Sequence, residues 1–146
     1  MRVLIVAPRL EIGGAEMHLC RVLPRLRQAG LDVSLFAVAR GGRLEPSLVA
    51  AGVPVCGGNA AGGRALGSLR TALALRGKIG RLKPDILHFF LPEPYLIGSL
   101  AAAGCKGIIR IMSRRALSHY QRNHPMLARV ERMLHRSVKA LIGNSS

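Results

Sequence analysis

Two adjacent glycines, Gly13 and Gly14, carry the most distinctive chemistry in the sequence. They follow the apolar run Arg2–Ala7 (RVLIVA) and precede residues 15–29, whose apolar positions repeat at helical spacing. Glycine lets the backbone approach a ligand closely, and a helix that begins there offers free N–H groups to an anion. The pattern predicts a phosphate-binding turn, and a plain tight turn remains the alternative.

The familiar nucleotide-binding signatures are missing from this turn. The sequence contains neither GxGxxG nor GxxxxGK[ST], and the second apolar run ends in Ala39-Arg40 instead of an acidic residue. The lack of GxxxxGK[ST] excludes the phosphate loop of a nucleotide hydrolase, and the other two absences argue against NAD. We therefore expect no cofactor.

The five histidines show no pattern of metal ligands. None has the HExxH motif or another ligand spacing, so we expect no metal ion. His18 lies just inside the first expected helix, where it faces either a ligand crevice or solvent. His88 lies in the apolar run DILHFF, where a core histidine and a cleft residue are both open interpretations.

A serine and two arginines, Ser113, Arg114 and Arg115, follow the apolar run 107–112. Two guanidinium groups at the end of a strand can clamp a phosphate. A solvated basic turn is the other interpretation. Residues 106–146 are the most basic stretch, with nine Lys and Arg against one acid.

Short apolar runs alternate with helical patterns along the whole chain. The expected strands are 2–7, 31–39, 53–56, 85–90, 107–112 and 139–143, and the expected helices are 15–29, 45–51, 65–82, 95–103 and 125–136. In helix 65–82 we expect the leucines and Ile79 to face the core, with Lys and Arg on the outer face. Pro24 should bend helix 15–29 or lower its stability.

This alternation predicts an α/β fold, a Rossmann-like parallel sheet of about six strands with helices on both faces. We expect residues 1–146 to form a single domain of this kind. In such sheets ligands bind beyond the carboxyl ends of the strands. Those ends carry the glycine turn and residues 40–44, 90–95, 113–115 and 144–146.

The composition favours a folded protein with an anionic partner. Of the 146 residues, 49% are hydrophobic and 20% are charged, which excludes a disordered chain. The 22 Lys and Arg against seven Asp and Glu give a net charge of +15, which predicts nucleic acid, an anionic membrane or a phosphorylated ligand as partner. Aromatic residues are few and no nucleic-acid-binding motif occurs, so we do not expect nucleic acid.

Several features indicate a cytoplasmic protein. Cys20, Cys56 and Cys105 are far apart in apolar surroundings, which predicts buried thiols in a reducing compartment. The N-terminal apolar run is too short for a signal peptide, and the longest uncharged run, 46–63, is interrupted by Gly and Pro. Helix 125–136 combines an apolar stripe with arginines, so it is either a core helix with a basic outer face or a peripheral contact with the inner face of the membrane.

Three segments of the sequence resemble glycosyltransferase family 4. The first is MRVLIVAPRLEIGGAEMHLCRVLPRLRQAGLDVSLFAV, the second is LKPDILHFFLPEPYLIGSLAAAGCKGIIRIMSRR, and the third is ALIGNSS. In this order they cover nearly the whole chain. The resemblance implies a retaining glycosyltransferase of the GT-B fold, in which two Rossmann-like domains face each other across a cleft.

The resemblance also implies roles for individual residues. The chain corresponds to the N-terminal domain, which mainly binds the acceptor, and the C-terminal donor-binding domain is absent from it. Gly13 and Gly14 would lie near the phosphates of the nucleotide-sugar donor, with Glu16 opening the helix. The residues expected to line the cleft or the acceptor site are His18, His88, Ser113, Arg114, Asn144 and Ser145.

Two positions depart from the family pattern. Ser113-Arg114 stand where many members have a histidine after the fifth strand, and Phe90 stands where many have a second one. The expected function is the transfer of a sugar from a nucleotide-diphosphate sugar to a hydroxyl of a glycan or a lipid-linked acceptor. The alternative is a non-catalytic, basic Rossmann-like module that binds nucleic acid or an anionic surface.

Overall fold

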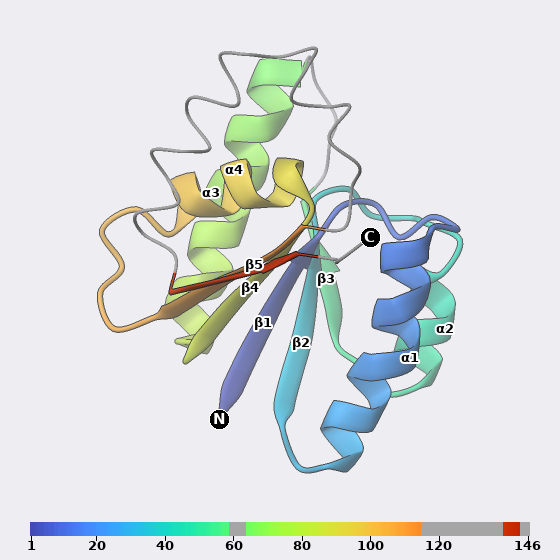
Figure 1. Cartoon of the computed structure of the whole chain (residues 1–146). Helices are drawn as coiled ribbons and strands as arrows, with labels where there is room; N and C mark the ends of the chain where they lie inside the picture. The colour runs from blue at the N-terminus through green and yellow to red at the C-terminus, as the bar shows by residue number, and fades with distance from the viewer. Residues whose placement is uncertain (59–63, 115–138, 144–146) are drawn as a thin grey trace.

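Strands and helices alternate in the computed structural model, which describes residues 1–58, 64–114 and 139–143 (Figure 1). The strands are β1 (Arg2–Ala7), β2 (Asp32–Ala37), β3 (Val55–Gly57), β4 (Ile86–Phe90), β5 (Ile109–Arg114) and β6 (Ala140–Gly143). The helices are α1 (Gly14–Gln28), α2 (Glu45–Ala50), α3 (Arg64–Leu82) and α4 (Pro92–Ala101). The predicted helix 125–136 and Arg115, Asn144 and Ser145 lie outside the described residues.

The described strands form one parallel sheet in the order β3-β2-β1-β4-β5-β6. This order confirms the predicted Rossmann-like α/β fold. The chain moves outward from β1 to β2 and β3, and then begins the other half of the sheet at β4, beside β1. The loops after β1 and β4 therefore lead to opposite faces, and ligands of such folds bind at this switch point.

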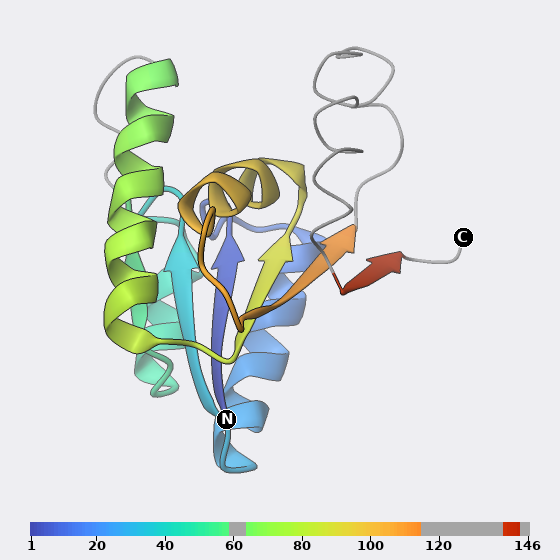
Figure 2. The ribbon, with the colours of Figure 1, turned by 90° about the vertical axis from the view of Figure 1, so that its left-hand side faces the viewer.

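The sheet has an apolar core on each face, and every residue of β1 after Arg2 is buried between these two cores. Side chains alternate along a strand, so Leu4 and Val6 join the cluster formed with α3 and α4, while Ile5 joins the cluster formed with α1 and α2. Figure 2 shows the two helix layers on opposite faces of the sheet. Burial on both faces explains why this strand is one unbroken apolar run in the sequence.

The first helix follows the prediction closely. α1 continues through Pro24, which cannot donate a hydrogen bond to the carbonyl of Cys20. Gly30, just beyond the helix, has φ +86°, the left-handed conformation expected of a residue that ends a helix. The local sequence is therefore sufficient to place both ends of α1 to within one residue.

Two boundaries differ from the prediction in ways that affect the site. α4 begins at Pro92 instead of residue 95, since proline is favoured in the first turn of a helix. β5 begins at Ile109 instead of residue 107, because Gly107 takes φ +80° and extends the preceding turn. β5 also ends later than predicted, at Arg114, so Ser113 and Arg114 lie within the strand and not after it.

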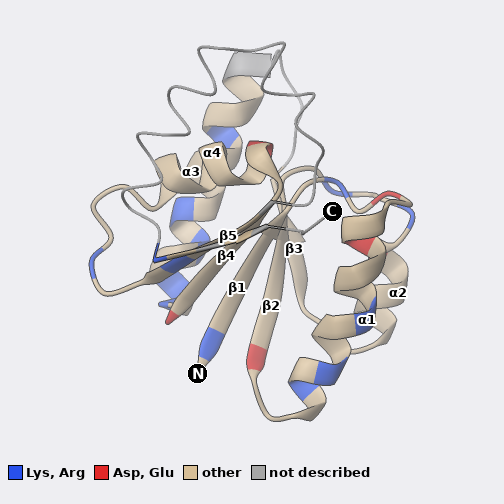
Figure 3. Ribbon diagram, viewed as in Figure 1, with Lys and Arg blue, Asp and Glu red and all other residues tan. Residues whose placement is uncertain are grey.

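The sequence predicts that the leucines of α3 face the core, but several of them do not. Leu75 and Ile79 are buried, whereas Leu66, Leu69 and Leu73 are 51%, 50% and 60% exposed. Leu75 follows Leu66 by about two and a half helical turns, so the two side chains point in opposite directions. Figure 3 shows basic residues and no acidic residue along the described part of this helix.

The backbone at Leu91, between β4 and α4, has φ +72° and ψ 162°, a conformation that favours glycine strongly. We predict that Leu91→Gly is more stable than Leu91→Ala by about 1–2 kcal/mol, because both variants lose the leucine side chain and only glycine relaxes the backbone. Urea unfolding of the two variants measures the difference. Equal midpoints would show that this backbone is not strained.

Candidate functional site

The turn before α1 has the geometry of an anion site. Gly13 precedes the helix with an extended backbone (φ −152°, ψ 162°) and provides no side-chain hydrogen bond to the first turn. Its carbonyl accepts the N–H of Met17 at 2.9 Å. The first N–H groups of a helix have no partner within the helix. Those at the start of α1 are therefore suited to an anion at the switch point between β1 and β4.

The two glycines of this turn have different surroundings. A Cβ on Gly13 would collide with the carboxylate of Glu16, which folds back over the turn. A Cβ on Gly14 would meet no atom within 4 Å. A ligand can therefore reach the backbone at Gly14, and the fold itself does not require glycine at this position.

Glu16 sets a condition on any anion at the turn. Its carboxylate lies in the first turn of α1, where it interacts favourably with the positive end of the helix dipole. Burial, and to a smaller degree the charge of Glu16, raise the pKa of the Cys20 thiol one turn further on. An anion at Gly14 would be repelled by the same carboxylate, so Glu16 must turn aside when one binds.

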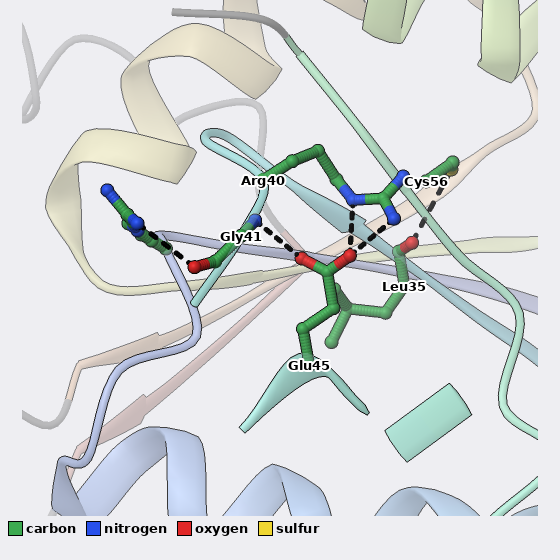
Figure 4. A network of polar contacts seen from close by, with 6 residues as sticks. Leu35, Arg40, Gly41, Glu45 and Cys56 are labelled. Carbon is green, nitrogen blue, oxygen red and sulfur yellow. Dashed lines mark hydrogen bonds and ion pairs between the residues drawn. The ribbon is translucent and has the colours of Figure 1, made fainter. Parts of the chain in front are cut away.

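A buried carboxylate holds the loop after β2 (Figure 4). Glu45 is 8% exposed and accepts hydrogen bonds from Nε of Arg40 at 2.6 Å and from the N–H of Gly41 at 2.9 Å. Nη2 of Arg40 forms an ion pair with the same carboxylate. The hydrogen bond from Arg40 is the main cause that lowers the pKa of Glu45, and the Gly41 N–H adds to it against the opposing effect of burial.

The loops after β1 and β2 are joined to each other. Arg9 donates a hydrogen bond to the carbonyl of Gly41 at 2.9 Å and forms an ion pair with Glu11, also at 2.9 Å. The N–H of Leu44 donates to the carbonyl of Leu10 at 2.9 Å. The segment that leads into the glycine turn therefore rests on the second loop, which Glu45 in turn holds in place.

Two predicted site residues come together on β4 and β5. Nε2 of His88 and Oγ of Ser113 are 2.7 Å apart, and the His88 ring lies 4.5 Å from the ring of Phe90. Ser113 is 3% exposed, while His88 is half-buried. The His88 side chain therefore has a hydrogen-bond partner on the neighbouring strand. Its burial is intermediate between the two interpretations that the sequence leaves open, a core residue and a cleft residue.

The other residues predicted to line the cleft are His18, Arg114, Asn144 and Ser145. His18 is half-buried on α1, and Arg114 is the last residue of β5. Asn144 and Ser145 fall outside the described residues. The roles expected for these residues stay predictions.

The predicted site residues do not include the four charged residues that organise this edge, Arg9, Glu11, Arg40 and Glu45. The contact between Arg9 and Gly41 joins residues 32 positions apart, so no local pattern reveals it. The five-residue separation of Arg40 and Glu45 was the available signal. An acid and a base on either side of a turn at a strand end are candidates for an ion pair across that turn.

The part of the chain that the structure describes contains no group of three or more His, Cys, Asp and Glu residues placed to hold a metal. Over the same residues, no helix is long and apolar enough to cross a membrane. Cys20, Cys56 and Cys105 are free thiols. The sequence predicts that these thiols are buried, but the structure leaves them half-buried, because each lies at the margin of an apolar cluster.

The parallel sheet, with an uncapped glycine turn at its switch point, defines a Rossmann-like domain of the type found in GT-B glycosyltransferases. The pattern of Glycosyltransferase Family 4 matches residues 12–146. This chain therefore belongs to Glycosyltransferase Family 4. No curated protein sequence matches it.

Solved structures share the fold at low sequence identity. HepE (Alr3699) of Anabaena, in complex with UDP and glucose, has a TM-score of 0.79 and 17% identity, over 99% of this chain and 38% of that chain. MurG of Acinetobacter baumannii has a TM-score of 0.70 and 19% identity, over 100% and 42%. A UDP-GlcNAc 2-epimerase of Methanocaldococcus jannaschii has a TM-score of 0.71 and 18% identity, over 99% and 40%. This chain thus spans about two fifths of each.

We predict that Glu45→Gln lowers the free energy of unfolding by about 1–2 kcal/mol at neutral pH, because the Arg40 guanidinium and the Gly41 N–H lose a charged acceptor while Arg40 stays partly in water. Since folding lowers the pKa of Glu45, its stabilisation exists above the ordinary pKa of 4.5 and disappears as the pH falls through the lower folded value. Urea unfolding at neutral pH and in acid should therefore show a difference from wild type that shrinks in acid.

Glu11→Gln is the matched control, because the Glu11 side chain is 48% exposed and its ion pair should contribute much less. An equal loss of stability in both variants, or a Glu45→Gln effect that does not change with pH, would contradict the role given to Glu45.

Proposed function

We propose that this chain is the acceptor-side domain of a retaining glycosyltransferase, which transfers a sugar from a nucleotide-diphosphate sugar to an acceptor hydroxyl. The observation that carries the proposal is the glycine turn, an uncapped helix start that is open at Gly14, in a chain of Glycosyltransferase Family 4. Such a helix start can bind the diphosphate of a donor. The HepE structure, which holds UDP and glucose on a similar fold, supports this type of donor.

In this proposal the glycine turn supplies backbone N–H groups and no reacting side chain. These groups would stabilise the negative charge that develops on the diphosphate as the sugar leaves. The bonds from Arg9 to Gly41 and from Leu44 to Leu10 hold the turn in place beforehand. Little reorganisation is then needed at the moment of transfer, which is the condition for strong electrostatic stabilisation.

In this proposal the carboxylates of the two loops, Glu11 and Glu45, do not act as nucleophiles. Arg9 engages Glu11, and Arg40 with the Gly41 N–H engages Glu45. The acceptor hydroxyl oxygen would form the new bond on the same face of the anomeric carbon from which the diphosphate departs, as the bond to the diphosphate breaks. Its proton would pass to the departing phosphate. This scheme agrees with the retention that the family resemblance implies.

On the acceptor side we place His88 and Ser113. The half-buried imidazole of His88 can exchange hydrogen bonds with the hydroxyls of a glycan or of a lipid-linked acceptor, while the buried hydroxyl of Ser113 orients the ring. The net charge of +15 suits an acceptor that carries phosphate or lies at an anionic membrane surface. The likeness to epimerases concerns the fold alone, and the family match favours transfer.

We predict that the 146-residue chain alone binds UDP-glucose with a dissociation constant weaker than about 1 mM. The reason is that the family resemblance assigns donor binding mainly to a second domain. Isothermal titration calorimetry measures the affinity. Micromolar binding would contradict the acceptor-side assignment, and tight binding of duplex DNA instead would favour the basic binding module.

We predict that Gly14→Val in the whole enzyme lowers turnover by about 100-fold or more, because the side chain blocks access to the helix N–H groups. The fold should survive, since a Cβ at Gly14 meets no neighbour. Turnover with a nucleotide-sugar donor and thermal unfolding are the two measurements.

Gly80→Val is the matched control, because Gly80 also lies in a helix with open space around its Cα, far along α3 from the turn. It should keep wild-type turnover. A folded Gly14→Val enzyme with wild-type turnover would reduce the glycine turn to a plain tight turn.

A further inference from the structure

The outer face of α3 exposes three leucines in a row. Leu66, Leu69 and Leu73 are each half-exposed or more, and their spacing places them on one side of the helix. Elsewhere in the described residues, no helix or strand exposes more than one large apolar side chain. Isolated exposed apolar residues are ordinary, but a contiguous group on a helix marks an interaction surface. We call these three residues the leucine patch.

The leucine patch lies on a helix that has no acidic residue. The α3 sequence, RALGSLRTALALRGKIGRL, contains five Lys and Arg and no Asp or Glu. Arg70 and Arg81 are exposed and lie near the patch in angle around the helix. Arg76 donates to the carbonyls of Ala101 and Ala103, so it also has a role in holding the end of α4. All the charged residues of this helix are therefore positive.

An anionic lipid surface fits this face better than a protein partner. Three half-exposed leucines cover a few hundred Å² at most, whereas a stable protein complex buries roughly 800 Å² on each side. Pairing with a second copy would also bring together two basic helices without a compensating acid. A bilayer needs no matching shape, and apolar side chains flanked by cations strengthen binding to it.

The position of the patch agrees with this partner. α3 runs antiparallel to the strands, so its N-terminal half extends past the carboxyl edge of the sheet, as Figure 2 shows. Gly77 and Gly80 leave the outer face of the C-terminal half without apolar side chains. Insertion would therefore be shallow and confined to the end of the molecule that also carries the glycine turn.

We propose that the outer face of α3 docks on an anionic lipid surface, with Leu66, Leu69 and Leu73 inserted between lipids and Arg70 and Arg81 against the phosphate headgroups. This surface is distinct from helix 125–136, where the sequence suggested a membrane contact. The proposal does not depend on sugar transfer, because it concerns the binding of the chain and not its reaction.

The test is co-sedimentation of the 146-residue chain with vesicles of phosphatidylcholine alone or mixed with phosphatidylglycerol. We expect binding to the mixed vesicles that weakens with added salt. Leu69→Gln/Leu73→Gln should weaken it at least about ten-fold, and Arg70→Gln/Arg81→Gln roughly 30-fold. The control is Met17→Gln/Val49→Gln, which changes exposed apolar residues on α1 and α2, across the sheet.

Three results would overturn the proposal. The first is equal binding to both kinds of vesicle, and the second is a leucine variant that binds like wild type or no worse than the control. The third is a wild-type chain that does not bind while the leucine variant unfolds at clearly lower urea or loses a concentration-dependent dimer. That third result would show that the patch is covered by the chain itself or by a second copy.

Discussion

Burial of β1 on both faces is the constraint on which the rest of this structure depends. A strand with apolar side chains on both sides needs a helix layer above it and another below it. Connections between parallel strands are right-handed, so the chain can build both layers only by moving away from β1 first in one direction and then in the other. The switch point between β1 and β4 is a consequence of that reversal, and the glycine turn lies at it.

The elements next to β1 could be predicted because their signals are local. Residues 3–7 are an unbroken apolar run, and Gly30 marks the end of α1 with a conformation that glycine adopts easily. The later boundaries shifted because Pro92 and Gly107 acted as the start of a helix and as part of a turn. Both residues were visible in the sequence, but each is compatible with two positions of the neighbouring element.

The rest of the site depends on contacts that no local pattern contains. The hydrogen bond from Arg9 to Gly41 requires β1 and β2 to be neighbours in a given register. The side of α3 that faces the sheet could not be predicted either, because leucines lie on both sides of that helix. Tertiary packing decides that Leu75 is buried and Leu73 is exposed. Residue types and spacing thus located the edge where a ligand would bind, and the packing decided which side chains are presented there.

The arginines of the two helix layers differ in whether a carboxylate is among their acceptors, although Arg9 and Arg27 also donate to the carbonyls of Gly41 and Val33. On the side of α1 and α2, Arg9, Arg27 and Arg40 form ion pairs with carboxylates. On the side of α3 and α4, Arg76 and Arg110 donate to backbone carbonyls at the end of α4, where the helix dipole is negative. Carboxylates take up protons in acid and carbonyl oxygens do not. Protonation of Glu45 in acid therefore weakens the contact of Arg40 on the first side and leaves the carbonyl contacts of Arg76 and Arg110 unchanged, so acid alters the support of the two sides unequally although they share one sheet.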